Sequence, residues 1–391
     1  MLIKPLKTMK KTLFYPLAGL LVLVAASCTP DAPPAPTPGG DIPDFSTHPK
    51  HAFYQAELEK HRQAQGAPGG LMLVKTPADG LWIGATGKSN LEHQTGMRGN
   101  ERFRVGSITK TFTATVVLKL QEEGKLSLDD KLADWLPATK GRIPQADGIT
   151  LRHLLTHTSG VRNVGDDNVP FQLALLNRPA DVDMSRPEPV LERYVYGKPL
   201  DFAPGTGYFY SNTGFTLLGM VAEKAGGRPL KRQMQELIFA PLGMQDTYLE
   251  KKDDPGVVRG YFDLYGNGKL LDVSDWEKAY DDGSAAGGLI TSATDLLKFS
   301  EALFGGRLLN AQSLAEMVTS VRLPSCPEGD CEYGYGLETW QFKVGRSQGH
   351  VGGVIGIDAI WFYFPGKQST VIIFTNKGVP SDKSILERLL S

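Results

Sequence analysis

The chain has 391 residues, which is enough to bury a sizeable core in one large domain or in two closely packed ones. Its composition, with 41% hydrophobic and 22% charged residues, is ordinary for a globular protein. The formal net charge of −1 argues against a nucleic-acid binder and against a strongly basic protein held on membrane surfaces.

The first 28 residues have the pattern of an export signal. Lysines precede an apolar run from Leu13 to Ala26, and small residues follow it. The run is short for a membrane-spanning helix, which needs about 20 apolar residues. Cys28 at its end resembles the lipidated first residue of a mature bacterial lipoprotein, and an ordinary signal peptide with an incidental cysteine is the alternative. Met9 is an alternative start, because two lysines follow it directly.

Residues 29–46, which begin TPDAPPAPTPGGDIPD, are rich in proline and poor in large apolar side chains. Such a segment cannot bury enough surface to offset its chain entropy, so we expect an extended tether. A tether suits a lipid anchor, which must hold a folded domain away from the bilayer. The sequence thus predicts an exported lipoprotein of the cell envelope, on the periplasmic or outer-surface side of a bacterial membrane, with the membrane contacted through the anchor alone.

A helix and a β-hairpin are the first elements predicted beyond the tether. The helix covers Phe53 to Gln65, and the hairpin joins Gly70–Val74 to Gly80–Thr86 through a turn that contains Pro, Asp and Gly. A long helix follows from Ser107 to Glu123. Its apolar residues lie nearly all round, so we expect it to be buried.

The middle of the chain reads mostly as helices broken by Pro and Gly, for example at residues 217–226 and 232–243. Another helix is predicted from Ser292 to Phe304, capped by Thr291 or Ser292. The pattern then changes to strands, followed by a closing helix. These last elements are Tyr335–Phe342, Ser347–Val351, Asp358–Phe364, Ser369–Asn376 and the helix Ile385–Leu390.

Two cysteines remain besides Cys28, and they flank four residues in SCPEGDC. Because an exported protein meets conditions that permit disulfides, we expect Cys326 and Cys331 to close a small loop. Two free thiols or half of a metal site are the alternatives. No histidine or further cysteine lies nearby in the sequence, which disfavours the metal site.

These elements predict an α+β fold for the domain at residues 47–391. The strands of both ends, within 47–124 and 285–391, join in one antiparallel sheet flanked by helices, and residues 125–284 form a second, mostly helical lobe. A cleft between such lobes is the usual place for an active site.

Ser107 and Lys110 stand three residues apart at the start of the long helix, in RVGSITKTF. Residues at this spacing share one helix face, so the amine can reach the hydroxyl. Burial and the positive end of the helix dipole both disfavour a charged lysine, which would let the amine accept the serine proton. Taken alone, a pair at this spacing is more often a capping serine beside a solvated lysine.

Residues 104–112 resemble the first motif, Ser-x-x-Lys, of the serine β-lactamase and penicillin-binding-protein superfamily. They resemble most the branch of class C β-lactamases, D-alanyl-D-alanine carboxypeptidases of that fold and related esterases. The stretches at residues 151–160, 241–247 and 284–299 fit the same branch. The resemblance implies the β-lactamase/transpeptidase-like fold, a catalytic cleft between the lobes, and Ser107 as nucleophile.

The branch has a second motif, Tyr-x-Asn, and this sequence holds two copies of that pattern. Tyr265-Gly-Asn267 is flanked by glycine and reads as a turn, whereas Tyr210-Ser-Asn212 precedes an amphipathic helix, as the motif does. The resemblance therefore implies that Tyr210 relays a proton between Ser107, Lys110 and the leaving group. It also implies that the Asn212 amide holds Lys110 and the substrate carbonyl.

The third motif of the branch, Lys/His-x-Gly, is matched by His350-Val-Gly352. The resemblance places His350 and Gly352 in the substrate-binding strand and pairs the Gly353 N–H with the Ser107 N–H as an oxyanion hole. Class C β-lactamases have lysine where this chain has His350. Histidine is mostly neutral at pH 7, so a permanent cation for a substrate carboxylate is lacking, which weakens a β-lactamase assignment.

No cofactor or metal is implied for the predicted reaction. His153 and His157 stand four residues apart, as metal ligands on a helix do, but no HExxH glutamate accompanies them and a capping role is favoured. The GxSxG motif of α/β-hydrolases is absent from the sequence.

The sequence predicts a serine hydrolase that acts on an amide or ester of the cell envelope through an acyl-enzyme, as a D-Ala-D-Ala carboxypeptidase-like peptidase or an esterase. A class C-like β-lactamase is one alternative. A non-catalytic penicillin- or peptidoglycan-binding module is the other. The partner is a small molecule or a peptide, and the sequence does not specify an oligomeric state.

Overall fold

The computed structural model describes residues 42–165, 168–323, 330–378 and 381–391. The predicted signal, the predicted lipidation site Cys28 and Cys326 lie outside these ranges. Cys331 is disulfide-bonded. Within the described ranges, no helix is both long enough and apolar enough to cross a bilayer.

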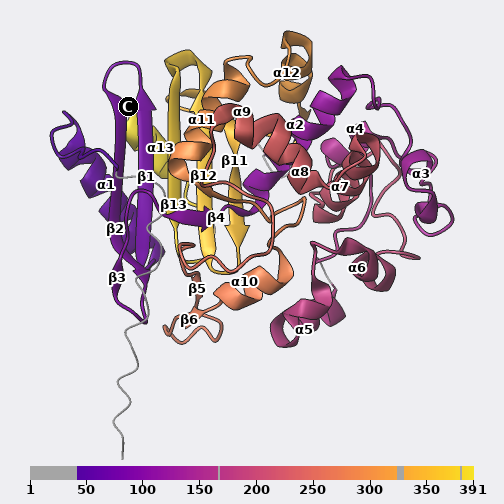
Figure 1. The fold of residues 1–391 in the computed structure, drawn as a ribbon, viewed down its shortest axis with the longest axis horizontal. Helices are drawn as coiled ribbons and strands as arrows, with labels where there is room; N and C mark the ends of the chain where they lie inside the picture. The colour runs from indigo at the N-terminus through magenta and orange to yellow at the C-terminus, as the bar shows by residue number, and fades with distance from the viewer. Residues whose placement is uncertain (1–41, 166–167, 324–329, 379–380) are drawn as a thin grey trace, which may run out of the picture. The chain divides into compact units, whose positions relative to one another are not determined.

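An antiparallel sheet occupies the left part of the view in Figure 1. Its strand order is β3-β2-β1-β13-β12-β11-β10-β9-β8. The hairpin from the start of the chain pairs with its last strand, for example Gly70 with Thr375, which confirms the predicted joining of the two ends. The strands are β1 Gly69–Thr76, β2 Gly80–Asn90, β3 Thr95–Gly96, β8 Val321–Arg322, β9 Cys331–Tyr333, β10 Glu338–Phe342, β11 Gly345–Val354, β12 Ile357–Phe364 and β13 Ser369–Thr375.

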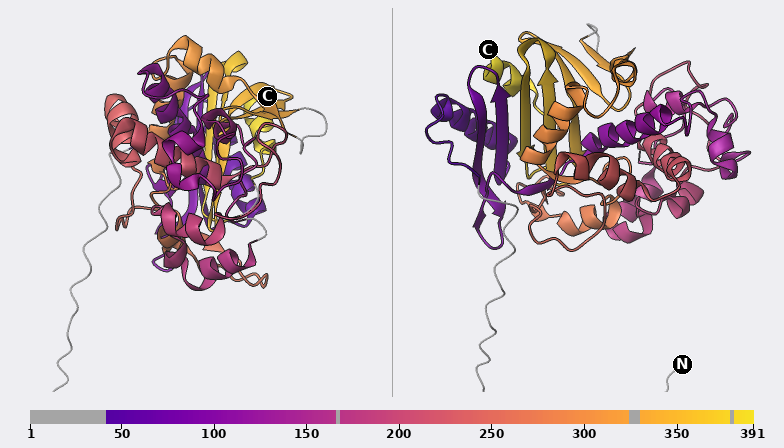
Figure 2. Two further views of the ribbon diagram at one scale, coloured as in Figure 1. Left: turned by 90° about the vertical axis from the view of Figure 1, so that its right-hand side faces the viewer. Right: turned by 45° about the horizontal axis from the view of Figure 1, so that its top comes forward.

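Apolar side chains cover both faces of this sheet. Alternate residues of a strand point to opposite faces, so Leu71 and Leu73 enter the main core while Met72 and Val74 enter a second one. The helices α1, His51–Gln65, and α13, Ser384–Leu390, pack on the second core. On the main core lie α2, Thr109–Glu122, and α11, Ala293–Phe304, and the turned view shows this layering (Figure 2). Two aromatic rings, Phe112 and Phe299, stack between α2 and α11 with centroids 3.7 Å apart.

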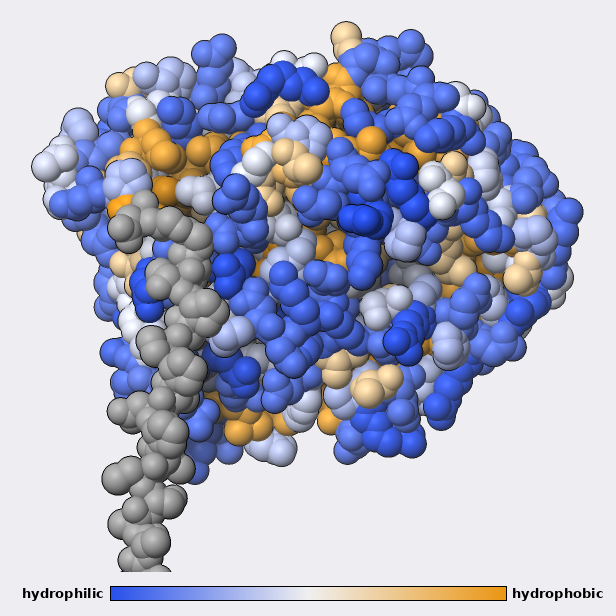
Figure 3. Space-filling model, viewed as in Figure 1, coloured by the Kyte–Doolittle hydropathy of each residue, from blue (hydrophilic) through white to orange (hydrophobic). Residues whose placement is uncertain are grey.

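Most of the remaining helices form the predicted helical lobe beside the sheet, and α3 to α7 lie at the right of Figure 1. They are α3 Leu132–Trp135, α4 Leu151–Leu155, α5 Val169–Asn177, α6 Pro187–Tyr194, α7 Asn212–Gly226, α8 Leu230–Met234, α9 Ala240–Leu242 and α10 Ser274–Tyr280, with α12 Ala311–Val318 near the sheet edge. Two small strand pairs complete the described fold, β4 Arg102–Arg104 with β7 Ile290–Ser292 and β5 Tyr261–Phe262 with β6 Leu271–Asp272. Hydrophilic residues cover most of the face seen in Figure 3.

Three predicted elements differ in detail from those observed. The buried helix begins with a 3-10 turn, Gly106–Ile108, before α2, and Gly106 at the start of that turn has a positive φ of 50°, which favours glycine. The predicted helix at 232–243 is divided between α8, a π-helical turn at Gln235–Phe239 and α9. The strand predicted from Tyr335 begins only at Glu338, because Gly336 has φ 64°.

Candidate active site

Ser107 lies in the 3-10 turn that joins strand β4 to helix α2. The turn is anchored just before the serine by Arg104, whose buried guanidinium donates two hydrogen bonds to Asp282, of 2.8 and 3.0 Å. Ser107 itself is partly exposed, while its neighbours Gly106 and Ile108 are buried. The local fold therefore presents one hydroxyl at the surface of an otherwise closed turn.

Lys110 lies in the first turn of α2, and its side chain is fully buried beneath Ser107. Its Nζ is 2.9 Å from Ser107 Oγ, 2.7 Å from Asn212 Oδ1 and 2.7 Å from the Ala286 carbonyl oxygen. The two carbonyl oxygens can only accept hydrogen bonds, so they take two N–H groups. A neutral amine then directs its lone pair at the serine hydroxyl, which is the arrangement that a general base requires.

Burial lowers the pKa of Lys110 to about 7, and the nearby carboxyl groups of Asp281 and Glu338 oppose this shift. An ordinary lysine has a pKa near 10.4 and is fully protonated at neutral pH. Because of the lowered pKa, a substantial fraction of the Lys110 amine is neutral at pH 7 and able to accept a proton.

The tripeptide Tyr210-Ser-Asn212 supplies three different contacts at the start of α7. The Tyr210 side chain is hydrogen-bonded to Ser107, and Lys110 Nζ lies 4.8 Å from the centre of its ring. Burial raises the pKa of Tyr210 well above its usual range, so the phenol is neutral. Ser211, which lies between Tyr210 and Asn212 in the chain, is the N-cap of α7, and its hydroxyl accepts a hydrogen bond from the Gly214 N–H. The structure thus brings Ser107, Lys110, Tyr210 and Asn212 together.

The other Tyr-x-Asn copy lies in an exposed turn, as predicted. Tyr265 is 72% exposed, and the N–H groups of Asn267 and Gly268 donate to the Asp263 carboxylate. The copy is therefore a loop that Asp263 organises, and none of its residues lines the cavity that holds Ser107.

Strand β11 passes directly beside the Ser107 turn because glycine occupies the contact positions. A Cβ on Gly352 would lie 1.9 Å from the Val105 carbonyl oxygen, and a Cβ on Gly106 would lie 2.8 Å from Gly353 N. Only glycine allows two backbones to approach this closely. Gly353 is exposed and lines the same cavity as Ser107. The geometry therefore suits an oxyanion hole made of the two backbone N–H groups, which remains a prediction.

The His350 ring lies inside the fold, with 1% of the residue exposed, and does not line the cavity. Its Nδ1 is 2.5 Å from the Val351 carbonyl oxygen, which accepts from N–H, so Nδ1 is the protonated nitrogen. The Tyr333 hydroxyl, 2.9 Å from Nε2, is then the donor to that nitrogen. Burial also lowers the pKa of His350. The structure therefore gives the ring hydrogen-bond partners in Val351 and Tyr333, with Glu338 Oε1 3.4 Å from Nδ1. Its direct contact with substrate stays a prediction.

The two histidines considered as metal ligands have structural contacts. His153 completes a capping box at the start of α4, where its N–H donates to Thr150 Oγ1 and its Nδ1 accepts from the Thr150 N–H. His157 is buried, with its Nδ1 accepting from the Ser211 N–H. The ring of His157 also packs on Tyr210, with centroids 4.3 Å apart. Within the described ranges, no three His, Cys, Asp or Glu residues are arranged to hold a metal ion.

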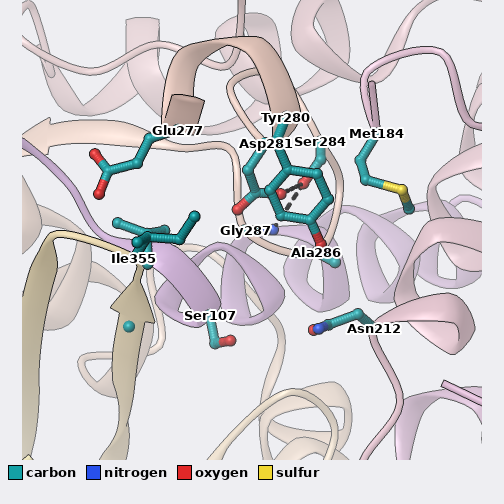
Figure 4. A pocket seen from close by; sticks show the side chains of 12 residues that line it. Ser107, Met184, Asn212, Glu277, Tyr280, Asp281, Ser284, Ala286, Gly287 and Ile355 are labelled. Carbon is teal, nitrogen blue, oxygen red and sulfur yellow. Dashed lines mark hydrogen bonds between the residues drawn. The ribbon is translucent and has the colours of Figure 1, made fainter. Parts of the chain in front are cut away.

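A cavity of about 260 Å³ opens over Ser107 (Figure 4). Ser107 and Asn212 lie on one side of it, and Asp281, Ser284 and Tyr280 lie across from them. Its lining residues are Ser107, Met184, Asn212, Glu277, Tyr280, Asp281, Ser284, Ala286, Gly287, Gly353, Val354 and Ile355. The cavity is thus formed jointly by the Ser107 turn, the start of α7, strand β11 and the segment after α10.

Sequence reasoning matched residues 284–299 to the branch but gave no site role to the segment from Asp281 to Gly288, which holds the third partner of Lys110. Besides the Ala286 carbonyl on Lys110, the Ala285 carbonyl accepts a 2.7 Å hydrogen bond from the hydroxyl of Thr113, one turn further along α2. The only signal was the glycine-rich run SAAGG, in which Gly288 has no room for a Cβ because Ser284 N would lie 2.1 Å away. The contacts themselves are made by backbone carbonyls, which carry no sequence signature.

The known proteins to which this chain is similar agree with the family model that matches it. The family model described as Beta-lactamase matches residues 55–390. Penicillin-binding protein 4* of Bacillus subtilis (strain 168) is 29% identical over 325 residues, which cover 79% of this chain and 68% of that protein. Esterase EstB of Burkholderia gladioli is 35% identical over 189 residues, and the match spans only 46% of each protein.

The solved structure of a D-stereospecific amidohydrolase from Streptomyces sp. is similar over nearly its whole length. The TM-score is 0.75 and the sequences are 32% identical, with 88% of this chain and 98% of that chain covered. The shared architecture confirms the predicted fold, an antiparallel sheet flanked by helices with a helical lobe beside it.

Proposed function

The chain belongs to the beta-lactamase family and is a serine hydrolase of the β-lactamase and penicillin-binding-protein superfamily, and we propose that it hydrolyses an amide or ester through an acyl-enzyme on Ser107. The observation that carries the proposal is the contact set of Lys110, a buried amine of lowered pKa held 2.9 Å from the Ser107 hydroxyl.

In the first step Ser107 Oγ attacks the substrate carbonyl carbon while its proton passes to the neutral Lys110 amine, so an Oγ–C bond forms. The N–H groups of Ser107 and Gly353 stabilise the resulting oxyanion. The C–N or C–O bond then breaks, and the leaving group takes a proton through the Tyr210 phenol. Water attacks the acyl-enzyme in the second half-reaction and releases the acid, which returns Ser107 to its starting state.

The relatives include proteins named for each of the two proposed reactions, ester hydrolysis and amide hydrolysis. An esterase and an amidohydrolase are similar to this chain, and so is a penicillin-binding protein. The last of these supports a D-Ala-D-Ala carboxypeptidase-like peptidase as the second candidate. A β-lactamase is less favoured, because no Lys, Arg or His is present among the described residues that line the cavity to pair with a substrate carboxylate.

A fluorescent penicillin and a p-nitrophenyl ester, each given to the wild type and to Ser107→Ala, test the proposal. We expect turnover or labelling of the wild type that is lost in the variant. Equal signals from both proteins, or none from either, would favour a non-catalytic binding module instead.

We also propose an envelope location through lipid-modified Cys28, supported by the apolar run and the proline-rich tether that flank it. Fractionation of bacterial cells that express the full chain and Cys28→Ser tests this. The wild type should pellet with membranes and the variant should not. Wild-type protein in the soluble fraction would contradict the anchor.

A further inference from the structure

The charge of the cavity over Ser107 is one-sided. Among the described residues that line the cavity, Glu277 and Asp281 are the two with an acidic or basic side chain, and both are acids. The Lys110 amine beside the nucleophile is fully buried and contacts three oxygen atoms of the protein. A substrate in the cavity therefore meets carboxyl groups and no opposing basic side chain from the lining.

The carboxyl group of Glu277 is held by contacts within the protein. Its side chain has no exposed surface, its Oε1 accepts a 2.5 Å hydrogen bond from the Gly356 N–H, and its Oε2 is 3.9 Å from an Arg104 nitrogen. In Figure 4 its carboxyl group points away from Ser107. Burial also raises the pKa of Glu277 to about 7. These contacts leave Asp281 as the carboxyl that a substrate beside Ser107 would meet.

Asp281 follows directly after α10 and is held in one orientation. Its Oδ1 accepts a 2.5 Å hydrogen bond from the Ser284 hydroxyl, which in turn accepts a 3.0 Å bond from the Gly287 N–H. Its Oδ2 lies so close to Gly287 that a Cβ there would be 2.2 Å away. Within the described ranges, no lysine or arginine lies within ion-pair distance of Asp281. Burial raises the pKa of Asp281, and the Ser284 hydrogen bond and the more distant Lys110 and Lys251 oppose this shift, so a substrate cation at the carboxyl would favour its charged form. The carboxyl is thus fixed at the cavity wall opposite Ser107 and Asn212 (Figure 4).

The geometry points to Asp281 as the specificity-determining residue that pairs with a protonated amine of the substrate, so the substrate class is amides and esters of amino acids with a free α-amino group. An α-ammonium is two bonds from the carbonyl that Ser107 attacks, so it enters the same cavity. The remaining walls include Met184, Tyr280 and Ile355, which offer apolar surface to a side chain. This inference rests on the proposed function, because it requires acylation at Ser107.

The position of Asp281 disfavours substrates with a carboxylate near the scissile bond and substrates without a free amine. A carboxylate near the scissile bond would face the like charge of Asp281, and like charges placed together disfavour binding. An N-acylated amino acid lacks the cation and leaves Asp281 without its partner. A charge-assisted hydrogen bond is stronger than a neutral one, so the loss of the cation should be clear in kcat/KM.

Four proteins and three kinds of substrate test the assignment. The substrates are alanine p-nitroanilide in both enantiomers, the N-acetylated forms of the same compounds, and p-nitrophenyl acetate as a neutral ester. The proteins are the wild type, Ser107→Ala, Asp281→Asn and the matched control Glu277→Gln, which removes the other acid of the cavity. The folding of each variant is checked by its thermal unfolding curve.

We expect the wild type to prefer a free-amine substrate over its N-acetylated form. Asp281→Asn should lower kcat/KM for the free amine about 10- to 100-fold and change the N-acetylated substrate and the neutral ester by less than about threefold. Glu277→Gln should keep the wild-type preference. Equal or greater wild-type activity on the N-acetylated substrates overturns the inference, and so does an equal loss on all substrates in Asp281→Asn, which would mean that Asp281 acts on Lys110 or on its own loop.

The neutral ester separates this inference from the proposed function. If p-nitrophenyl acetate is turned over by the wild type and not by Ser107→Ala, the proposed function stands whatever the amine preference. If no substrate shows turnover that depends on Ser107, the proposed function fails, and the substrate class that rests on it fails with it.

Discussion

The two sides of Ser107 are built in different ways. On the helix side, the side chains of Lys110 and Asn212 and the Ala286 carbonyl form a closed set of hydrogen bonds around one buried amine. On the strand side, Gly352 and Gly353 contribute backbone only, and the nearest ionisable ring, that of His350, is turned inward. The helix side therefore depends on which side chains are present, whereas the strand side depends on glycine residues, which have no side chain.

The largest expected effect is on the helix side. Lys110→Met removes the group that accepts the serine proton, so we expect kcat/KM to fall by about 10³-fold or more. The variant relieves the burial of an amine but leaves the Asn212 and Ala286 oxygens without their donor, so we expect its unfolding temperature to stay close to that of the wild type. Turnover of p-nitrophenyl acetate and thermal unfolding measure the two quantities.

Lys119→Met is the control for this change, because Lys119 lies on the same helix, donates to the Leu308 carbonyl and does not line the cavity that holds Ser107. It should retain activity within about threefold. If Lys110→Met kept near wild-type activity, the base would have to be sought elsewhere, with Tyr210 the first candidate.

The next largest effect is expected on the strand side. In Gly352→Ala, the added Cβ would lie 1.9 Å from the Val105 carbonyl oxygen, so β11 must move away from the Ser107 turn. Displacing one oxyanion donor costs about 10²- to 10³-fold in kcat. We expect a loss of about 100-fold in kcat for ester hydrolysis.

Gly366→Ala serves as the control, because no heavy atom lies within 4 Å of a Cβ at Gly366. It should match the wild type in kcat and in thermal stability. Wild-type kcat in Gly352→Ala would show that the close approach of the two backbones is not needed for the reaction.

The pH dependence of kcat/KM distinguishes Lys110 from His350 as the group that must be deprotonated for activity. The Lys110 pKa is lowered to about 7, and the neutral amine is the active form. The active fraction is nearly complete above pH 8 and falls about tenfold per unit as the pH drops below 7. We therefore expect an acid limb of kcat/KM with a midpoint near 7. A midpoint that stayed in place when His350 was replaced by Asn would assign the limb to Lys110, and its loss in that variant would assign it to His350.

The smallest effect is expected at the hydroxyl that holds His350. Tyr333→Phe removes the donor to His350 Nε2, which lies 2.9 Å away, but leaves the glycines of β11 in place. A lost hydrogen bond of this kind costs about 1 kcal/mol, so we expect at most about a fivefold loss in kcat/KM and a slightly lower unfolding temperature. Tyr265→Phe, at an exposed tyrosine, is the control. A loss as large as that of Lys110→Met would place His350 in the chemistry.

Side chains were predictable from the sequence where their chemistry follows a pattern. The Ser107–Lys110 spacing and the choice of Tyr210-Ser-Asn212 over Tyr265-Gly-Asn267 both agree with the observed contacts. The joining of the two chain ends in one sheet was also predictable, because strand-like segments occur at both ends and one shared sheet is the simplest way to pair them.

Other features of the site could not be read from residue types. The Ala286 carbonyl acts through its backbone, so any residue there would offer the same oxygen. The positive φ of Gly106 and its approach to Gly353 depend on how two distant segments pack. The inward turn of His350 follows from its contacts with Tyr333 and Val351, which tertiary packing sets.

Mass spectrometry of the intact protein after brief exposure to p-nitrophenyl acetate or penicillin tests the central claim most directly. Mapping of the modified peptide then locates the adduct. We predict one acyl group on the wild type, carried by Ser107, and none on Ser107→Ala. An adduct on another residue, or turnover that persists in Ser107→Ala, would contradict Ser107 as the nucleophile.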